Sequence, residues 1–467
     1  MNYGKITEET LVIFQKIVSK ENVSVDQESL EKYSYDETPH GLRHCPDVVI
    51  KPENTRQVSD ILKLVNKHRI PVTFRGQGTG LANGAVPLYG GVVMSFEKMN
   101  KIAVDEDNLM AEVEAGTVLF DLRQEVEKRG LFYPADPGEK TSTMGGNVAT
   151  NAGGMNCVKY GKVRDYVLGL EIVLSSGKIL MLGGKTVKRS SGYELMHLII
   201  GSEGTLAAVT KVIIKLIKLP KRFITLYIPF DEANNAVKSV SKILKKRITP
   251  TAMEFVEREV ILETEKQTGK KMPHNESEAY LIIRIDGDDD TILFEEGEKI
   301  ANICLENGAL DVFFADSKER QHRIWDVRSL FYDGVVKNKK NIEIIDTVIP
   351  PSKIADYMRT AKKIADAHGI KIIGFGHAGD GNIHLHPIGD GLSQKEWYRK
   401  HKMVMKELYE SSVALGGTIS GEHGIGVSKK EYLQIGLDEN QISLMREIKK
   451  IFDPNIILNP GKIFDME

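Results

Sequence analysis

The sequence predicts an α+β protein built from more than one domain. Its 467 residues, at about 100–200 residues per domain, suggest two to four domains. In the first half, short apolar runs bounded by turn residues predict strands, and glycine-rich stretches follow them. After Leu219-Pro220 glycine becomes sparser, and strand-like runs alternate with amphipathic helical patterns. We therefore expect a second α+β domain to begin there.

The elements of the first half follow from periodicity. Residues 1–45 are polar and predicted to be helical, and apolar residues at helical spacing predict helices over 55–68 and 119–129. The Ser176-Gly177 turn predicts a hairpin within 168–182. The other expected strands of this half are 71–74, 91–95, 110–115 and 212–216.

In the second half, the same patterns predict two long strands and three amphipathic helices. The strands are expected at 223–228 and 279–285, and the helices at 232–245, 357–368 and 441–452. From Ile372 the chain becomes rich in glycine and histidine.

Composition excludes several classes of protein. Lys plus Arg number 63 and Asp plus Glu 65, so the net charge of −2 argues against a nucleic-acid-binding protein. There are only three cysteines, Cys45, Cys157 and Cys304, which are too few for a disulfide framework or a four-cysteine iron–sulfur cluster. There is no signal-peptide pattern and no apolar stretch of about 18 residues. We expect a cytoplasmic protein without a transmembrane segment.

A glycine loop follows the strand predicted at 71–74. Glycines in Arg75-Gly-Gln-Gly-Thr-Gly-Leu-Ala-Asn-Gly84 allow backbone N–H groups to approach a phosphate. Leu81 breaks the dinucleotide-binding fingerprint, and no Lys-Ser/Thr pair follows as in a P-loop. Taken alone, this loop is equally compatible with a structural turn.

Two further stretches of small, hydrogen-bonding residues favour a ligand. Residues 137–154 form a long stretch of glycine and small polar residues, suited to a backbone that lies against a flat polar ligand. Residues 202–210 add a third element of similar composition.

Together the three segments resemble the FAD-binding domain of the vanillyl-alcohol oxidase/PCMH flavoprotein superfamily. They are most similar to its branch of FAD-linked 2-hydroxy-acid dehydrogenases, and the resemblance covers roughly residues 40–465. It implies an α+β fold with a PCMH-type, two-subdomain FAD-binding domain and an α+β cap domain with an antiparallel sheet. The implied parts are an N-terminal helical segment (1–45), the FAD-binding domain (46–220), the cap or substrate domain (221–415) and a C-terminal segment that returns to the FAD domain (416–467).

The resemblance also implies which residues bind FAD. Some members attach FAD through a histidine of the first loop, but no histidine lies between His68 and His197, so we expect non-covalent FAD. The residues matching the family's FAD contacts are Arg75, Gly76, Gln77, Gly78, Thr79, Gly80, Asn83, Gly84, Pro137, Gly138, Thr141, Gly145, Gly146, Asn147, Asn151, Gly153, Glu203, Gly204 and Asn459.

Five of the twelve histidines fall between residues 377 and 423. His384 and His386 would share one face of a strand, and the glycines around His377 would allow a turn back toward them. Such a pair is often an ordinary half-buried one, yet imidazoles beside Glu422 also suit a divalent cation. The resemblance implies a metal (zinc, iron or manganese) bound by His377, His384 and Glu422, with His423 as the base and His386 in a supporting position.

Three arginines near Trp325 are candidates to bind a substrate carboxylate. Arg320, Arg323 and Arg328 cannot all share one helical face, and a solvated basic face is the alternative. The resemblance selects Arg328. Tyr332, expected one turn later on the same face, would add a hydrogen bond.

The resemblance implies a D-2-hydroxy-acid dehydrogenase that acts on D-lactate. Relatives that oxidise a five-carbon dicarboxylate have lysine where this chain has Ile344 and asparagine where it has His386. These differences favour a small monocarboxylate. Glycolate and D-2-hydroxyglutarate remain alternatives, as does a non-catalytic subunit that relays electrons. No second redox motif is visible, so we expect electrons to pass to a partner such as an electron-transfer flavoprotein or an iron–sulfur subunit.

Overall fold

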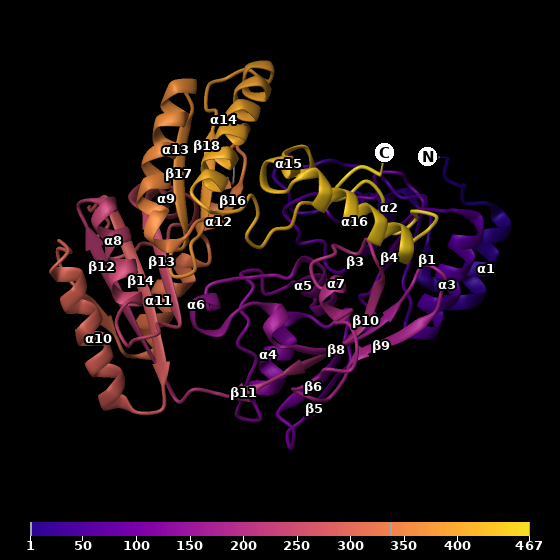
Figure 1. The fold of residues 1–467 in the computed structure, drawn as a ribbon, viewed down its shortest axis with the longest axis horizontal. Coiled ribbons are helices and arrows are strands. Elements are labelled where there is room, and N and C mark those ends of the chain that lie inside the picture. The colour runs from indigo at the N-terminus through magenta and orange to yellow at the C-terminus, as the bar shows by residue number, and fades with distance from the viewer. Residues whose placement is uncertain (1, 337–338, 467) are drawn as a thin grey trace. The chain divides into compact units, whose positions relative to one another are not determined.

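The computed structural model describes residues 2–336 and 339–466. The chain folds into two compact units, each discontinuous in sequence (Figure 1). The first unit comprises Met1–Gly153, Lys162–Leu219 and Glu422–Glu467, and the second comprises Gly154–Gly161 and Pro220–Gly421. Residues 154–161 therefore group with the second unit, whereas the sequence prediction placed them within 46–220.

A small mixed sheet forms the first part of unit 1. Its order is β1-β2-β4-β3, with β2 and β3 both parallel to β4. Helix α3 begins after Asn54, whose side chain accepts a hydrogen bond from the N–H of Gln57, and its apolar stripe packs into the core of the sheet. The strands and helices of this part are α1 (Glu8–Val18), β1 (Val23–Ser24), α2 (Gln27–Lys32), β2 (Val48–Ile50), α3 (Thr55–His68), β3 (Val72–Arg75) and β4 (Val92–Ser95).

The C-terminal segment covers the outer edge of this sheet. The N–H of Val72 in β3 donates to the carbonyl of Ile457, and the N–H of Asn459 donates to the carbonyl of Val72. The last helices, α15 (Leu433–Gly436) and α16 (Glu439–Phe452), lie in the segment that leads to this edge.

An antiparallel sheet forms the second part of unit 1, in the order β5-β6-β10-β8-β9. The hairpin expected at 168–182 is β8–β9, with Gly177 at a φ of 79° in its turn. The elements here are β5 (Ile102–Asp105), β6 (Met110–Glu114), α4 (Leu119–Glu127), β7 (Leu131–Phe132), α5 (Met144–Thr150), β8 (Val167–Val173), β9 (Ile179–Gly183), α7 (Met196–Ile199), β10 (Ala208–Lys215) and β11 (Ile217–Lys218).

Unit 2 is built on a seven-stranded antiparallel sheet, as the α+β cap prediction required. The order is β15-β12-β14-β13-β17-β18-β16. The strands are β12 (Arg222–Phe230), β13 (Ala252–Glu257), β14 (Ala279–Gly287), β15 (Phe313–Ala315), β16 (Ile345–Val348), β17 (Lys371–His377) and β18 (Asn382–Ile388).

Helices cover both faces of this sheet. One face packs against α9 (Arg258–Thr268), α11 (Lys318–Arg328) and α12 (Phe331–Val336) in a shared apolar core. On the opposite face, Glu257 pairs with Lys362 of α13. Helices α8 (Ala233–Leu244), α10 (Asp290–Leu305), α13 (Ile354–His368) and α14 (Gln394–Ala414) form a connected row there. No helix among the described residues has the length and apolar content needed to cross a bilayer.

The short segment 154–161 is held to unit 2 by one buried carboxylate. Its helix α6 (Cys157–Tyr160) packs against β13. Lys159 forms an ion pair with Asp286, and the hydroxyl of Tyr160 donates to Asp286 Oδ2 over 2.7 Å. These contacts explain why residues 154–161 group with unit 2, although the residues before and after them in the sequence belong to unit 1.

Candidate functional site

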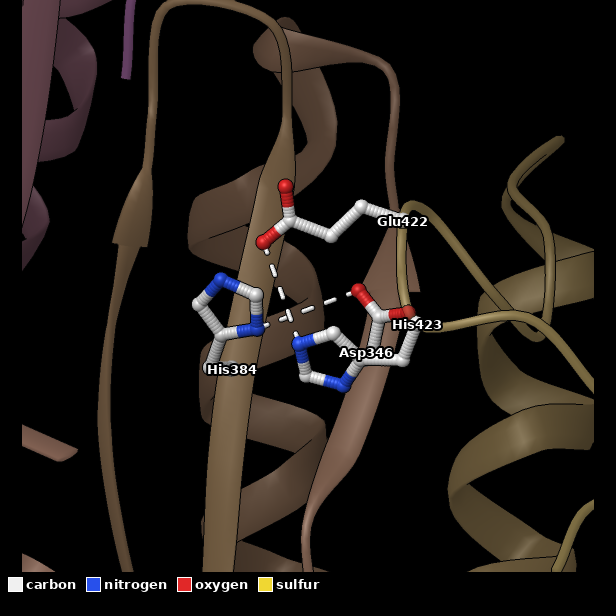
Figure 2. Close-up of side chains that lie close together, drawn as sticks. All are labelled: Asp346, His384, Glu422 and His423. Atoms are coloured by element: carbon white, nitrogen blue, oxygen red, sulfur yellow. Dashed lines mark ion pairs between the residues drawn. The ribbon is translucent and has the colours of Figure 1, made fainter. Parts of the chain in front are cut away.

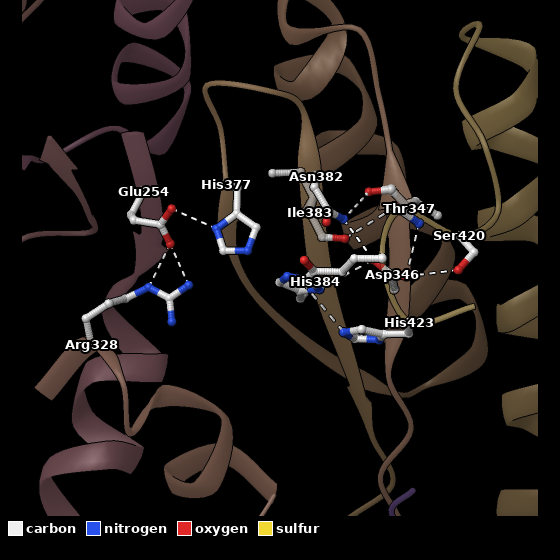
Figure 3. Close-up of polar contacts among 12 residues, drawn as sticks. Glu254, Arg328, Asp346, Thr347, His377, Asn382, Ile383, His384, Ser420 and His423 are labelled. Atoms are coloured by element: carbon white, nitrogen blue, oxygen red, sulfur yellow. Dashed lines mark hydrogen bonds and ion pairs between the residues drawn. The ribbon is translucent and has the colours of Figure 1, made fainter. Parts of the chain in front are cut away.

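Polar side chains from four adjacent strands of unit 2 lie on one face of the sheet. In register, Glu254 of β13 is opposite His377 of β17, and His384 of β18 is opposite Asp346 of β16. Alternate residues of a strand point to the same face. The neighbouring apolar residues of β13, β17 and β18 belong to the core beneath α11 and α12. The four polar side chains therefore face the same side as these helices (Figure 3).

Asp346 fixes the chain that leads to the predicted Glu-His pair. Its fully buried carboxylate accepts hydrogen bonds from Asn382 Nδ2 (2.9 Å), Ser420 Oγ (3.0 Å) and the N–H of Gly421 (3.0 Å). A Cβ at Gly421 would lie 2.7 Å from Asn382 Nδ2, so only glycine allows this approach. Glu422 and His423 follow directly after this anchored turn.

Four side chains form a group that could hold a metal ion. Asp346, His384, Glu422 and His423 each offer a ligand atom, and these atoms lie within 4.8 Å of one another (Figure 2). His384 Nδ1 is 3.8 Å from Asp346 Oδ1, and His423 Nε2 is 3.8 Å from Glu422 Oε1. Two imidazoles and two carboxylates suit zinc, iron or manganese, so the residues present fit a divalent cation.

The predicted metal ligands are only partly gathered in this group. His384 and Glu422 belong to it, together with the predicted base His423, whereas His377 does not. The ring of His377 lies edge-on to that of His384, with centroids 5.3 Å apart. His386 is buried and stacks on Phe375. Sequence reasoning did not single out Asp346, although a lone acid within the apolar run 344–349 was a visible signal.

Of the three candidate arginines, the structure buries Arg328 and leaves Arg320 and Arg323 exposed. The guanidinium of Arg328 donates to Glu254 Oε2 from Nε (2.7 Å) and lies 2.5 Å from it through Nη2. Arg328 is thus the arginine that lies on the site face of the sheet.

Tyr332 does not lie on the same helix as Arg328, contrary to the expectation. Helix α11 ends at Arg328, where the N–H of Leu330 bonds to the carbonyl of Val327 and tightens the last turn. Tyr332 belongs to α12 and packs, half-buried, against the core beneath the sheet.

Glu254 is a central residue of the site that sequence reasoning missed. Burial disfavours its ionised form, but the positive charge of Arg328 and the hydrogen bond from His377 outweigh this and lower the pKa of its carboxyl below the ordinary value. The signal in the sequence was a single acid inside the apolar strand 252–256.

In unit 1, the first glycine loop packs directly on the second stretch. Arg75 ends β3, and its Nη1 donates to the carbonyl of Tyr35 over 2.6 Å. A Cβ at Gly76 would overlap the side chain of Thr143, which caps α5. The second stretch is therefore not loop throughout, because Thr143 starts a helix whose Gly145 lies against Ala115.

The third element is joined to both the first loop and the C-terminal segment. The carboxylate of Glu203 accepts hydrogen bonds from the N–H groups of Ile425 (2.8 Å) and Gly426 (2.7 Å). Asn459 Nδ2 donates to the carbonyls of Glu203 (2.7 Å) and Gly84 (3.2 Å). Asn459 thus links two segments predicted to contact FAD.

The loops leave room for a ligand along part of their length. A Cβ at Gly84 or Gly138 would meet no atom of the described residues within 4 Å. Asn83 is buried and its Oδ1 accepts from the N–H of Leu42. This arrangement fits a cofactor that lies against the loop backbone. The other predicted FAD contacts stand in the same three elements: Gln77, Gly78, Thr79, Gly80, Pro137, Thr141, Gly146, Asn147, Asn151, Gly153 and Gly204.

Comparison with known proteins gives matches along most of the chain. The family described as FAD binding domain matches residues 46–183, and the family of FAD linked oxidases, C-terminal domain, matches residues 219–463. A D-lactate dehydrogenase of Anaerostipes hadrus is 40% identical over 99% of this chain and 98% of its own length. A D-lactate dehydrogenase of Archaeoglobus fulgidus is 44% identical over 93% of this chain and 95% of its own length. The glycolate oxidase subunit GlcD of Bacillus subtilis is 40% identical over 92% of this chain and 92% of its own length.

Solved structures share the fold at low sequence identity. Substrate-bound p-cresol methylhydroxylase superposes with a TM-score of 0.81 at 17% identity, covering 99% of this chain and 98% of that one. A 4-ethylphenol oxidase from Gulosibacter chungangensis superposes with a TM-score of 0.78 at 19% identity, covering 99% of each chain. These similarities confirm the PCMH-type α+β fold.

Proposed function

Because the chain belongs to the family of FAD-linked oxidases and is an FAD-dependent 2-hydroxy-acid dehydrogenase, we propose that it oxidises D-lactate to pyruvate at a metal-assisted site. The observation that carries this proposal is the group of Asp346, His384, Glu422 and His423. Two of its members, Asp346 and His384, lie on the sheet face whose Glu254 pairs with the buried Arg328 of α11.

Each side chain has a role in binding or proton transfer. Arg328 binds the substrate carboxylate, because a guanidinium matches a carboxylate in charge and geometry. Tyr332 adds a hydrogen bond from the adjacent helix. His423 accepts the hydroxyl proton, since a neutral imidazole is a base suited to neutral pH.

The cofactors supply the remaining chemistry. The three loop elements would hold FAD non-covalently, and the bound cofactor would supply the hydride acceptor, flavin N5, for the α-hydrogen of the substrate. A divalent cation held by His384 and Glu422, with His377 or Asp346 beside them, would polarise the substrate hydroxyl as a Lewis acid. The substrate loses two electrons and two protons, and His423 holds one of these protons.

The surroundings of the site favour a small substrate. Ile344 stands where relatives that oxidise a five-carbon dicarboxylate have lysine, and it is buried and apolar, so it offers no cation for a second carboxylate. His386 is buried against Phe375. We therefore place D-lactate ahead of D-2-hydroxyglutarate, with glycolate as a second small substrate.

The electrons leave through another protein in this proposal. A partner such as an electron-transfer flavoprotein or an iron–sulfur subunit would reoxidise the flavin.

The proposed location is the reducing cytoplasm. Thiols stay reduced in that compartment, and the described cysteines form no disulfide.

The test is anaerobic reduction of the flavin by substrate. The purified, metal-loaded protein is mixed with D-lactate, L-lactate, glycolate or D-2-hydroxyglutarate, and flavin absorbance is followed. We expect bleaching with D-lactate and none with L-lactate. If no substrate bleaches a flavin that dithionite reduces, the proposal is wrong and an electron-relay subunit becomes the better description.

A further inference from the structure

Glu254 is a fully buried carboxylate that joins two residues of the candidate site. Its Oε2 accepts a hydrogen bond from Nε of Arg328 over 2.7 Å and pairs with Nη2 over 2.5 Å. Its Oε1 lies 2.7 Å from Nδ1 of His377 (Figure 3). A buried charge is costly unless it is paired and hydrogen-bonded, and here both carboxylate oxygens are used.

The pair with Glu254 sets the direction of the Arg328 guanidinium. Arginine has donors on three nitrogens in a rigid plane, and Glu254 engages Nε and Nη2. The guanidinium carbon Cζ of Arg328 lies over the rings of Phe331 and Phe375, at 5.4 Å and 5.1 Å from their centroids. The plane is thus held from several sides, and Nη1 remains to meet a substrate carboxylate.

The same carboxylate sets the tautomer of His377. An ionised carboxylate only accepts hydrogen bonds, so Nδ1 of His377 carries the hydrogen in this contact. In the neutral ring, Nε2 then holds the lone pair. The strand register supports this contact, because Glu254 of β13 is directly opposite His377 of β17.

We propose that Glu254 is a positioning residue that presents Nη1 of Arg328 to the substrate carboxylate and Nε2 of His377 to a metal ion. This inference rests on the proposed function. Glu254 acts only through its two neighbours and need not touch the substrate.

The first test is Glu254→Gln, which keeps the shape but leaves one acceptor oxygen between two donors. We expect KM for D-lactate to rise at least about tenfold with a smaller change in kcat, because Arg328 binds the carboxylate in the ground state and the transition state alike. Glu257→Gln is the matched control. Glu257 is a buried acid of the same strand, and it pairs with Lys362 on the opposite face of the sheet. The Glu257→Gln variant should keep the wild-type KM for D-lactate.

A double-mutant cycle separates positioning from general damage. In an Arg328→Gln background, Glu254→Gln should change kcat/KM for flavin reduction by far less than in the wild type, since the group it positions is gone. An equal loss in both backgrounds would overturn the assignment, as would an unchanged KM. If Glu254→Gln does not fold, Glu254→Asp takes its place, because it keeps the charge but is too short to reach both partners.

Cobalt binding gives a readout that is independent of turnover. Titration of the metal-free protein with Co²⁺ alone, followed by absorbance, should show weaker binding in Glu254→Gln by about 10–100-fold. Arg328→Gln and Glu257→Gln should bind Co²⁺ as the wild type does. If the wild type oxidises none of the 2-hydroxy acids, the proposed function fails, and this titration alone decides on Glu254: unchanged Co²⁺ affinity rejects its role.

Discussion

The N–H of Gly421 donates a 3.0 Å hydrogen bond to Oδ2 of Asp346, so a strand carboxylate fixes the residue immediately before Glu422 and His423. The same carboxylate is 3.8 Å from Nδ1 of His384. Asp346 therefore organises the group from two directions, by anchoring the incoming chain and by standing beside one of its imidazoles.

Replacing Asp346 by asparagine should weaken metal binding. The amide would place a donor against either Asn382 or the Ser420–Gly421 turn, and so break one of these two anchors. We expect Co²⁺ affinity to fall by about 10–100-fold and substrate-driven flavin reduction to fall with it. Ser420→Ala, which removes one hydrogen bond, should have a milder effect, and Asp366→Asn on the exposed face of α13 should have none. Wild-type Co²⁺ affinity in Asp346→Asn would count against this role.

Removing the metal should stop the reaction without emptying the flavin site. After dialysis against EDTA, we expect D-lactate no longer to bleach the flavin, because no cation polarises the hydroxyl. Dithionite should still reduce the flavin, and Zn²⁺, Mn²⁺ or Fe²⁺ should restore the reaction with D-lactate. Full activity in protein shown by elemental analysis to be metal-free would contradict the metal-assisted mechanism.

His423→Ala should abolish proton transfer while the protein keeps FAD. Loss of a general base slows a reaction by about 10²–10⁴-fold. Stopped-flow absorbance with D-lactate measures this rate, and the bound FAD is measured in the same sample. His197→Ala, at a histidine whose side chain is 44% exposed, is the control and should react normally. A His423→Ala variant that reduces its flavin at the wild-type rate would show that another group is the base.

Gly84→Ala should lower FAD affinity without unfolding the loop. The added methyl group meets no described atom within 4 Å, so the FAD-free fold should tolerate it. If FAD lies along this backbone, the methyl group takes its space, and we expect affinity to fall about tenfold. Titration of the FAD-free protein measures affinity, and urea unfolding checks stability. Gly76→Ala should instead lower stability itself, because its Cβ would overlap Thr143. Unchanged FAD affinity in Gly84→Ala would place the cofactor elsewhere.

Lys462 should give the FAD-free protein a stability that rises with pH. It is buried, its Nζ donates to the carbonyl of Val86, and burial lowers its pKa from 10.5 to about 7. Above pH 7 the unfolded chain therefore binds one proton more at this residue than the folded chain does. The free energy of unfolding then rises by about 1.4 kcal/mol per pH unit up to about pH 10.

The check for Lys462 is urea unfolding at pH 7, 8 and 9, compared with Lys462→Met, which cannot titrate. The difference in unfolding free energy, wild type minus variant, should increase with pH. A difference that does not change with pH would show that Lys462 has an ordinary pKa.

Local signals in the sequence predicted helices and motifs well. Helix α3 has the expected bounds, because its apolar residues recur at helical spacing and Asn54 caps it. Helix α5 was missed since its glycines and small residues show no apolar periodicity. The break after Arg328 was missed as well, because residues 329 and 330 carry no strong breaker.

The residues of the candidate site also differ in whether a local signal in the sequence marks them. His384, Glu422 and His423 lie in glycine-rich segments that can be recognised from the sequence alone. Glu254 and Asp346 reach the site only through strand pairing, and Glu254 meets a histidine 123 residues later in the chain. Spacing along the chain carries no information on such register. Isolated acids within apolar strands are nevertheless a signal that can be sought.

The late arrival of the segment that covers the edge of β3 has a consequence for synthesis of the protein. Residues 457–459, which pair with this edge, are translated after the whole of Pro220–Gly421. At about 5–20 residues per second, the ribosome needs roughly 10–40 s for that stretch. During this interval the nascent chain can complete the seven-stranded sheet while an edge of the four-stranded sheet stays open, and open edges invite association between chains.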